Sequence, residues 1–419
     1  MRKDSDFWLG VNYWPAKKGM GWWKDFDESE VKNDFKRIKD DLGLDYVRIF
    51  LMWDDFQPKP DETNKESLEK LGKVLDTARE NDLKVMPTIL TGHMSGINWL
   101  PEWALSDKKM NGKEKSRTHK QISGGKYTDR KLKDMYSDPF MLNAETRFIK
   151  DVVGTYADHS AICGWDLSNG CTHVQKAKDP ATERSWNNKL YHEIKKYDPK
   201  HPVTLGAPTF LDDKNNKYVS RLNSCNDLLS VHAYPLFVDY VDDLDPDFAP
   251  FLVSLMRGLT GKKRPVLLQE FGVCTVPQKK GTAHDTAKDP GVKKDVLLAR
   301  EGDAAKYYGE VLKRSYEAGA SGAWAWCYSD YDRSLYGKPP FDSVKFERHF
   351  GLLRADGSLK PAAAAMKEFK KKLENGEIER RENDYAIPEK YLSRLMGKDG
   401  YGRKELESAY KGFKAARKN

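Results

Sequence analysis

Eight short apolar segments, alternating with stretches of helical periodicity, run through most of this 419-residue chain. Several of them are continuously apolar and rich in Val, Ile or Leu, as strands buried on both faces are. Strands that alternate with helices predict a parallel sheet, and eight is the number that closes a barrel. The predicted strands are Phe7–Tyr13, Tyr46–Met52, Lys84–Leu90, Ile162–Ser168, Pro202–Gly206, Leu228–Ala233, Val266–Glu270 and Gly322–Trp326.

The stretches between these strands carry apolar residues at intervals of three or four positions, as the stripe of Val31, Phe35 and Ile38 does. A doubly wound open sheet is the alternative, and it is disfavoured because no glycine-rich phosphate loop follows the first strand. We therefore predict an α/β fold, a (β/α)8 TIM barrel, over residues 1–373. Residues 374–419 are highly charged and form a predicted C-terminal extension with one short amphipathic helix, with disorder as the alternative.

Composition excludes several classes of protein. Hydrophobic residues make up 39% and charged residues 32% of the chain, as in a water-soluble protein with a large core. No apolar run reaches the length of a membrane span, and no apolar signal segment precedes the first strand, which predicts a cytoplasmic protein or a secreted one that has been trimmed. The net charge of +8 is concentrated between Asp107 and Asp134. Without a nucleic-acid motif, this basic run predicts a solvated loop and no nucleic-acid partner.

Polar residues collect at the predicted C-terminal ends of the strands, where barrel enzymes carry their sites. Glu270 gives the strongest signal, because an ionised glutamate in an apolar strand is costly without a purpose. Residues two apart share one face of a strand, so His232 and Tyr234 are expected to point into one cavity, as are Trp324 and Trp326. The candidate residues are Arg48, His93, Asn169, His232, Tyr234, Glu270, Trp324 and Trp326.

Two long connections follow the third and seventh predicted strands, at residues 93–137 and 274–300. Both begin on the face where a barrel builds its site, so they are expected to form walls of a substrate pocket. Walls of this size predict a closed pocket, and therefore exo action on short oligosaccharides if the substrate is a sugar.

The ordered candidate set resembles that of clan A glycoside hydrolases, most closely glycoside hydrolase family 5, over about residues 7–372. The resemblance implies a barrel that hydrolyses β-linked sugars with retention and without a cofactor. In that reaction Glu270 is the nucleophile, and Arg48 and Tyr234 keep its carboxylate ionised and oriented. Asn169 bonds the sugar's 2-hydroxyl, His93 and His232 bind substrate, and Trp326 or Trp324 supplies an apolar plate.

The chain departs from the family pattern at Gly170. The family motif places the acid/base glutamate directly after the asparagine, and here Asn169 is followed by glycine. Asp166 lies on the same strand but about 13 Å deeper, which makes it a poor substitute. Loss of proton transfer removes several orders of magnitude in rate. We therefore predict an acid/base-deficient variant. A deliberate substitution and a natural pseudoenzyme both explain the glycine, and the otherwise intact site favours the first.

Size and layout resemble the exo-acting β-mannosidases of the family, with endo-mannanase, β-glucosidase and cellulase activity as alternatives. A non-catalytic carbohydrate-binding barrel is an alternative of another class. A metal-dependent hydrolase is disfavoured because the histidines lack ligand spacing and no Asp, Glu or His cluster converges with them, so no metal is expected. An oligosaccharide is the expected partner, and the sequence makes no prediction of oligomeric state.

Overall fold

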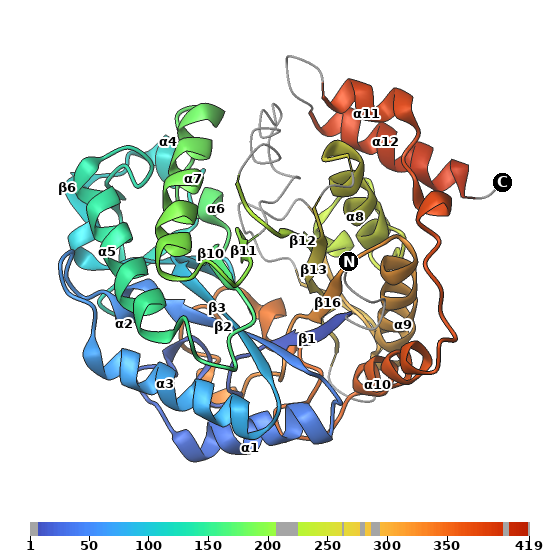
Figure 1. The fold of residues 1–419 in the computed structure, drawn as a ribbon, viewed down its shortest axis with the longest axis horizontal. Coiled ribbons are helices and arrows are strands. Elements are labelled where there is room, and N and C mark those ends of the chain that lie inside the picture. The colour runs from blue at the N-terminus through green and yellow to red at the C-terminus, as the bar shows by residue number, and fades with distance from the viewer. Residues whose placement is uncertain are drawn as a thin grey trace.

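The computed structural model describes residues 7–206, 225–261, 264–276, 281–285, 294–396 and 402–417. Eight parallel strands form one sheet in the order β11-β10-β3-β2-β1-β16-β13-β12 (Figure 1). Where the two end strands meet, the Asp227 amide donates to the carbonyl of Val203 over 3.0 Å, and the Ser230 hydroxyl donates to that of Leu205 over 2.8 Å. These bonds bring the sheet round into a nearly closed barrel, which confirms the predicted fold class.

Each of the eight predicted strand segments overlaps a strand of this sheet, and two of these strands end one residue later than predicted, at Thr91 and Phe271. The buried, mostly apolar segments leave no face for water, as a parallel sheet covered by helices requires. The strands are β1 (Trp8–Asn12), β2 (Tyr46–Met52), β3 (Lys84–Thr91), β10 (Trp165–Ser168), β11 (Val203–Thr204), β12 (Leu229–Ala233), β13 (Val266–Phe271) and β16 (Gly322–Ala325).

Helices surround the barrel (Figure 1). Most of them bury one apolar stripe, whereas Phe248–Met256 is buried on all sides. The first of them begins after Asp27, whose side chain accepts hydrogen bonds from the backbone amides of Ser29 and Glu30 and so caps the helix. The long barrel helices are α1 (Glu28–Asp40), α3 (Lys65–Glu80), α5 (Pro139–Tyr156), α7 (Pro180–Tyr197), α8 (Phe248–Leu259), α9 (Glu301–Glu317) and α10 (Pro361–Glu374). Three short helices lie in connections: α2 (Trp53–Phe56), α4 (Gly112–Lys115) and α6 (Cys171–Val174). None of the described helices combines the length and apolar character needed to cross a membrane.

The long connection after β3 is a small folded unit rather than an open loop. Its strands form two sheets, β4-β5-β7-β8 and β6-β9. Part of its positive charge is neutralised internally, since Lys115 pairs with Asp129 over 2.8 Å and Lys131 pairs with Glu114 over 2.6 Å. The strands are β4 (His93–Met94), β5 (Ile97–Trp99), β6 (Leu105–Lys109), β7 (Lys120–Ser123), β8 (Lys126–Thr128) and β9 (Arg130–Leu132).

The described part of the connection after β13 forms an antiparallel pair, β14 (Ala283–Asp285) and β15 (Val296–Leu298). Residues 277–280 and 286–293 of this predicted pocket wall lie outside the described residues.

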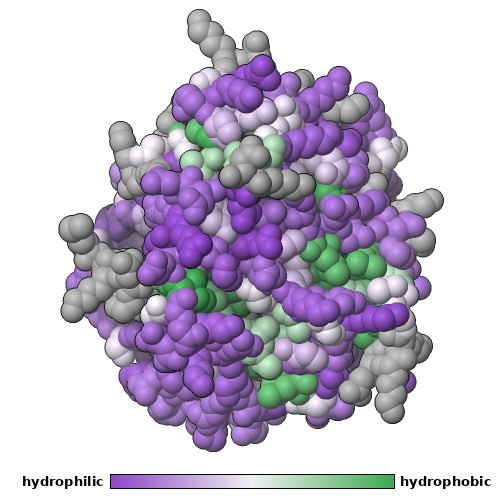
Figure 2. Space-filling model, turned by 90° about the vertical axis from the view of Figure 1, so that its right-hand side faces the viewer, coloured by the Kyte–Doolittle hydropathy of each residue, from purple (hydrophilic) through white to green (hydrophobic). Residues whose placement is uncertain are grey.

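The C-terminal extension folds back on the barrel beside α8 (Figure 1). It contains the predicted short helix, α11 (Glu389–Leu395), and a second helix, α12 (Arg403–Ala416). The rings of Tyr410 and Phe413 on α12 lie 5.1 Å and 5.5 Å from the ring of Phe251 on α8. Figure 2, which views the molecule from this side, shows apolar residues in separate groups on a mainly hydrophilic face. The apolar side of α12 therefore packs the described part of the extension against the barrel.

Candidate active site

Glu270 lies on β13 at the C-terminal end of the barrel strands, with 6% of its surface exposed. Its Oε1 atom accepts a hydrogen bond from Nη1 of Arg48 over 2.6 Å, and its Oε2 atom accepts one from the Tyr234 hydroxyl over 2.8 Å. Nδ1 of His232 lies 3.3 Å from Oε2. The structure thus brings the predicted nucleophile together with three of its predicted neighbours, and both carboxylate oxygens are held in place.

Arg48 on β2 is fully buried, and its guanidinium bonds to side chains on four other strands, β1, β3, β10 and β13. Its Nη2 atom donates to Oδ2 of Asp166 on β10 over 2.6 Å and to Oδ1 of Asn169 over 2.9 Å. Its Nη1 atom donates to Oδ1 of Asn12 on β1 over 3.2 Å, in addition to its bond with Glu270. A planar guanidinium with donors fixed in a fork suits this task, because it orients several acceptors at once.

Asp166 is fully buried below the site and supports Arg48. Its Oδ2 atom also accepts from the hydroxyl of Thr88 over 2.7 Å and from Nε2 of Gln269 over 3.2 Å, while Oδ1 accepts from the amide of Gly206 over 2.6 Å. Both of its oxygens are engaged in hydrogen bonds within the protein. Asp166 is therefore a positioning residue, and sequence reasoning did not identify Thr88 or Gln269 as its partners.

Burial and neighbouring charge set the protonation of the two side chains beside the nucleophile. Burial raises the pKa of the Tyr234 hydroxyl well above 10, and the Glu270 carboxylate adds to this shift, so the phenol keeps its proton and donates it in a hydrogen bond. Burial lowers the pKa of His232 below 6.5, the Glu270 carboxylate opposes this shift, and the positive charge of Arg48 adds to it. Both side chains are therefore neutral near pH 7.

Gly170 follows Asn169 at the end of β10, in the left-handed conformation with a φ of 52°. A Cβ atom at this position would lie 3.0 Å from Cδ2 of His173 and 3.5 Å from Cδ2 of His93. The amide of Asn169, by contrast, is fixed at both ends, since its Nδ2 atom donates to the carbonyl of His93 over 3.0 Å. Position 170 thus provides neither a carboxyl group nor ready space for one.

The two tryptophans of the last strand have different surroundings. Trp324 is fully buried and packs in the barrel interior with Trp8, Met86 and Leu267, where a sugar has no access. This placement argues against the predicted contact between Trp324 and substrate. Trp326 is 4% exposed and lies beyond β16 on the side of the site, so it is the better candidate for the apolar plate.

Glu347, which sequence reasoning missed, lies beside Trp326. Its Oε2 atom accepts a hydrogen bond from Nε1 of Trp326 over 3.3 Å and from the hydroxyl of Ser95 over 3.0 Å. The side chain is largely buried, at 7% exposure. It lies in the connection after β16, where periodicity gives no signal, and only the fold brings it to the site.

Three histidines converge on the Gly170 side of the site. His93, His119 and His173 each place one ring nitrogen within 4.8 Å of those of the other two. The expectation that no histidines converge is therefore wrong. The chain positions lie far apart in sequence, so only the folded insertion after β3 brings His119 to the other two.

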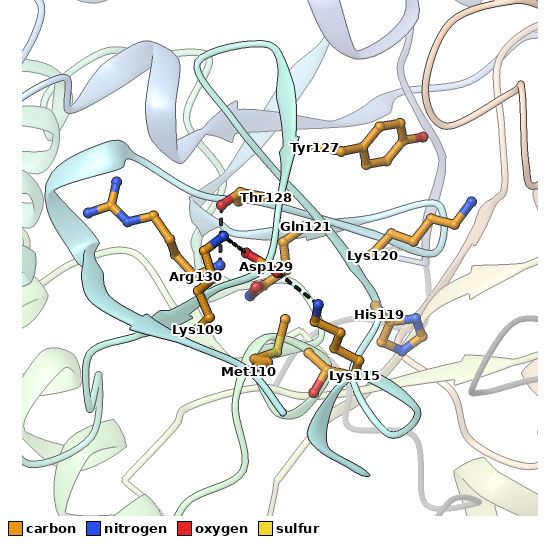
Figure 3. Close-up of a pocket in the computed structure, with 11 residues that line it drawn as sticks. Lys109, Met110, Lys115, His119, Lys120, Gln121, Tyr127, Thr128, Asp129 and Arg130 are labelled. Carbon is orange, nitrogen blue, oxygen red and sulfur yellow. Dashed lines mark hydrogen bonds and ion pairs between the residues drawn. The ribbon is translucent and has the colours of Figure 1, made fainter. Parts of the chain in front are cut away.

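A cavity of about 640 Å³ opens within the insertion after β3 (Figure 3). Lys115, Lys120 and Arg130 line it, and His119 forms part of its wall. Glu270 is not among its lining residues, so this cavity is distinct from the space around the nucleophile. It reaches the histidine cluster from the side of the insertion.

A family model and the sequences of known proteins both relate this chain to glycoside hydrolases. Residues 4–294 match the family model described as Cellulase (glycosyl hydrolase family 5). A probable mannan endo-1,4-beta-mannosidase C from Aspergillus terreus (strain NIH 2624 / FGSC A1156) is 27% identical over 162 residues, which is 36% of this chain and 35% of that protein. The mannan endo-1,4-beta-mannosidase A-2 of the same organism, also described as probable, is 28% identical over 153 residues, which is 35% of this chain and 32% of that protein. The matches thus span about a third of these relatives.

Two solved structures share the fold over most of the chain. A GH5_18 protein from Streptomyces cattleya, in complex with Manb1-4GlcNAc, has a TM-score of 0.71 and 18% identity, covering 98% of this chain and 92% of that one. An exo-beta-1,4-mannosidase from Opitutaceae bacterium strain TAV5 has a TM-score of 0.66 and 24% identity, covering 87% of this chain and 59% of that one. At these identities the likeness shows the fold alone.

Proposed function

The chain belongs to glycosyl hydrolase family 5, and on this premise we propose that it cleaves β-mannosyl oligosaccharides by a retaining mechanism that lacks a side-chain acid/base. The observation that carries the proposal is the carboxylate of Glu270, held by Arg48 and Tyr234 at the end of β13. Two hydrogen bonds orient the two oxygens of this side chain, as nucleophilic attack on an anomeric carbon requires.

The β-mannosyl substrate class is supported by the relatives. Curated mannan endo-1,4-beta-mannosidases match in sequence, and folds of an exo-beta-1,4-mannosidase and of a GH5_18 protein bound to Manb1-4GlcNAc match in structure. Trp326 offers a plate for one sugar ring, and Glu347 beside it offers an acceptor for sugar hydroxyls. The folded insertion after β3 supports a walled pocket, and hence removal of a terminal residue, over an open cleft.

The glycine at position 170 is expected to affect the reaction differently according to the leaving group and the step, because only some of these need proton transfer. Formation of the glycosyl ester on Glu270 needs no proton when the leaving group is already a weak base. Departure of a sugar alcohol does need one, and hydrolysis of the ester needs a base for the incoming water. Without a carboxyl group at Gly170, activated substrates are expected to react quickly in the first step and then accumulate as the ester.

Rapid mixing with 2,4-dinitrophenyl β-mannoside tests this proposal. We expect a burst of about one equivalent of dinitrophenolate, followed by slow turnover, and intact-protein mass spectrometry is expected to show one added mannosyl group. Absence of both the burst and the adduct would overturn the proposal. The corresponding β-glucoside and β-galactoside, measured in parallel, decide the sugar.

Restoring the acid/base needs two substitutions. Gly170→Glu alone meets the ring of His173 and strains a left-handed backbone. Gly170→Glu combined with His173→Ala makes room, and His173→Ala alone is the control. We expect only the double variant to gain hydrolysis of mannobiose, by about 10²–10⁴-fold.

The second candidate function is sugar binding without turnover. It is favoured by the close approach of His173 to position 170, which occupies the space of a catalytic side chain. A protein of this kind would bind mannobiose in calorimetry and show no dinitrophenolate burst.

A further inference from the structure

The histidine cluster beside Gly170 has the composition of a metal site. His93 follows β3, His119 precedes β7 in the insertion, and His173 lies in α6 after β10. Three imidazoles from separate segments are the ligands of a catalytic zinc ion that keeps one position open. The first two are buried and the third is partly buried, so three basic rings are gathered away from water.

The spacing of the ring nitrogens is close to what a metal requires. Nitrogen ligands at about 2.05 Å from a tetrahedral zinc ion stand about 3.3 Å from one another. Nε2 of His119 and Nδ1 of His173 share a hydrogen bond of 2.9 Å, which an ion bound by both nitrogens would replace, and all three ligand atoms lie within 4.8 Å of one another. The separation that one ion requires therefore lies within the range of these distances.

Asn98 supplies the outer support that metal-binding histidines usually have. Its Oδ1 atom lies 2.7 Å from Nδ1 of His93, and its Nδ2 atom donates to the carbonyl of His173 over 3.0 Å. The second bond fixes the orientation of the amide, so Oδ1 accepts and Nδ1 of His93 carries the proton. The lone pair of His93 is then on Nε2, which makes this nitrogen the one that can act as a metal ligand.

The cluster lies where the missing carboxyl group would act. A Cβ atom on Gly170 would be 3.0 Å from the ring of His173 and 3.5 Å from that of His93. The carbonyl of His93 also accepts from Asn169, whose Oδ1 atom is bonded to the same guanidinium that holds Glu270. The cavity in Figure 3 adjoins the cluster, because His119 forms part of its wall.

We propose that His93, His119 and His173 bind one divalent transition metal ion, zinc in the first place, whose bound water takes over the acid/base function that Gly170 cannot provide. The catalytic part of this proposal rests on the proposed function. The site itself is independent of it, since its evidence is the geometry of the three rings.

The two steps of the reaction balance with such a water. As Glu270 bonds to the anomeric carbon and the glycosidic bond breaks, the metal-bound water gives a proton to the departing oxygen and becomes hydroxide. The hydroxide then takes a proton from a second water, whose oxygen attacks the anomeric carbon and releases Glu270 as carboxylate. The sum is one glycoside and one water converted to two sugars.

Metal binding is tested first on the full chain after dialysis against EDTA. We expect mass spectrometry of the reloaded protein to give one zinc per chain, cobalt(II) to give the visible spectrum of a tetrahedral nitrogen site, and zinc to raise the melting temperature. His119→Ala is expected to weaken zinc binding by about 100-fold, and Asn98→Ala by about 10–100-fold. His284→Ala, at an exposed histidine, is the control for stray binding. Fewer than one zinc ion per chain, or a zinc affinity of His119→Ala equal to that of the parent protein, would overturn the proposed site.

The role of the ion is tested with two substrates. Zinc is expected to accelerate hydrolysis of mannobiose by about 10²-fold or more. With the dinitrophenyl substrate, zinc is expected to leave the rate constant of the burst unchanged, because ester formation needs no proton, and to raise the steady-state rate that follows it, because the ester is then hydrolysed faster. A burst without any zinc effect on mannobiose would overturn the catalytic role while the proposed function stands. No burst with or without zinc would reject the proposed function and with it the catalytic role, and the metal stoichiometry would still decide the site.

Discussion

Nη1 of Arg48 lies 2.6 Å from Oε1 of Glu270, which is 222 positions away in the chain, and the pair is closed off from solvent on the arginine side. The same guanidinium lies 2.6 Å from Asp166. One positive charge therefore serves two buried carboxylates, and their geometry depends on it.

Replacing Arg48 by methionine is expected to destabilise the fold as well as the site. The change keeps apolar bulk but leaves Asp166 and Glu270 without their cation, and loss of one partner from a buried ion pair costs about 3–5 kcal/mol. Urea unfolding measures the difference. Arg79→Met, at a half-exposed surface ion pair, is the control and is expected to change stability by less than about 0.5 kcal/mol. Equal effects of the two changes would contradict the role of Arg48.

Replacing Glu270 by glutamine is expected to abolish the dinitrophenolate burst and the mannosyl adduct. The amide keeps the shape of the side chain but is not a nucleophile. Circular dichroism and calorimetry verify folding, and Glu379→Gln, at an exposed glutamate of the extension, is the matched control. A burst that survives in Glu270→Gln would show that another group attacks the sugar.

Much of this architecture was predictable from the sequence, and so was the ring of residues around Glu270. Parallel strands buried on both faces leave a continuous apolar signal, and polar residues at their ends stand out against it. The role of Asp166 was less accessible, since it depends on reach across the barrel to Arg48. Trp324 and Trp326 share strand phase, yet Trp326 lies past the end of β16 and only one of the two faces the site.

The histidine cluster and α12 were missed for different reasons. His119 lies in a basic run that reads as a loop, and only the pairing of β5 with β7 brings that segment to His93 and His173. In α12 the buried residues follow helical spacing, but the lysines and the glycine between them weaken the periodic pattern in the sequence. These buried residues are Leu406, Ala409, Tyr410 and Phe413. Spacing along the chain detects ligands within one element, and this set comes from three.

The buried carboxyl group of Asp34 predicts a distinct pH dependence of stability. Burial raises its pKa from 3.8 to about 6, despite hydrogen bonds from the hydroxyls of Tyr13 and Tyr328, each at 2.9 Å. The folded state therefore holds this proton more tightly than the unfolded state. The protonated carboxyl group therefore stabilises the folded state, and this stabilisation is fully present below pH 3.8. It amounts to about 3 kcal/mol at most and is lost as the pH rises to about 6.

Asp34→Asn removes this titration, so the variant is expected to gain stability relative to the parent as the pH rises from 4 to 7.5. Urea unfolding of both proteins at a series of pH values measures the difference. A difference that is the same at every pH would contradict the raised pKa of Asp34.

The packing of α12 on α8 predicts a coupled loss of stability and order. Phe413 is fully buried, so Phe413→Ala is expected to cost about 3–5 kcal/mol if the extension unfolds with the barrel, and less if it detaches alone. Hydrogen exchange over residues 402–417, together with the melting temperature, distinguishes unfolding of the whole chain from detachment of the extension alone. Lys411→Ala, at a 70% exposed side chain of the same helix, is the control. Unchanged exchange in Phe413→Ala would contradict the packing, and the dinitrophenolate burst is expected to be the same in all three proteins.

Azide rescue tests the central claim most directly, that Glu270 forms a glycosyl ester in a site whose side chains lack an acid/base. Azide is a nucleophile that needs no base, so it attacks the ester that water leaves intact. With 2,4-dinitrophenyl β-mannoside and EDTA-dialysed protein, we predict that azide raises the steady-state rate and that the product is β-mannosyl azide. An α-mannosyl azide, or a rate that azide does not change, would contradict the account.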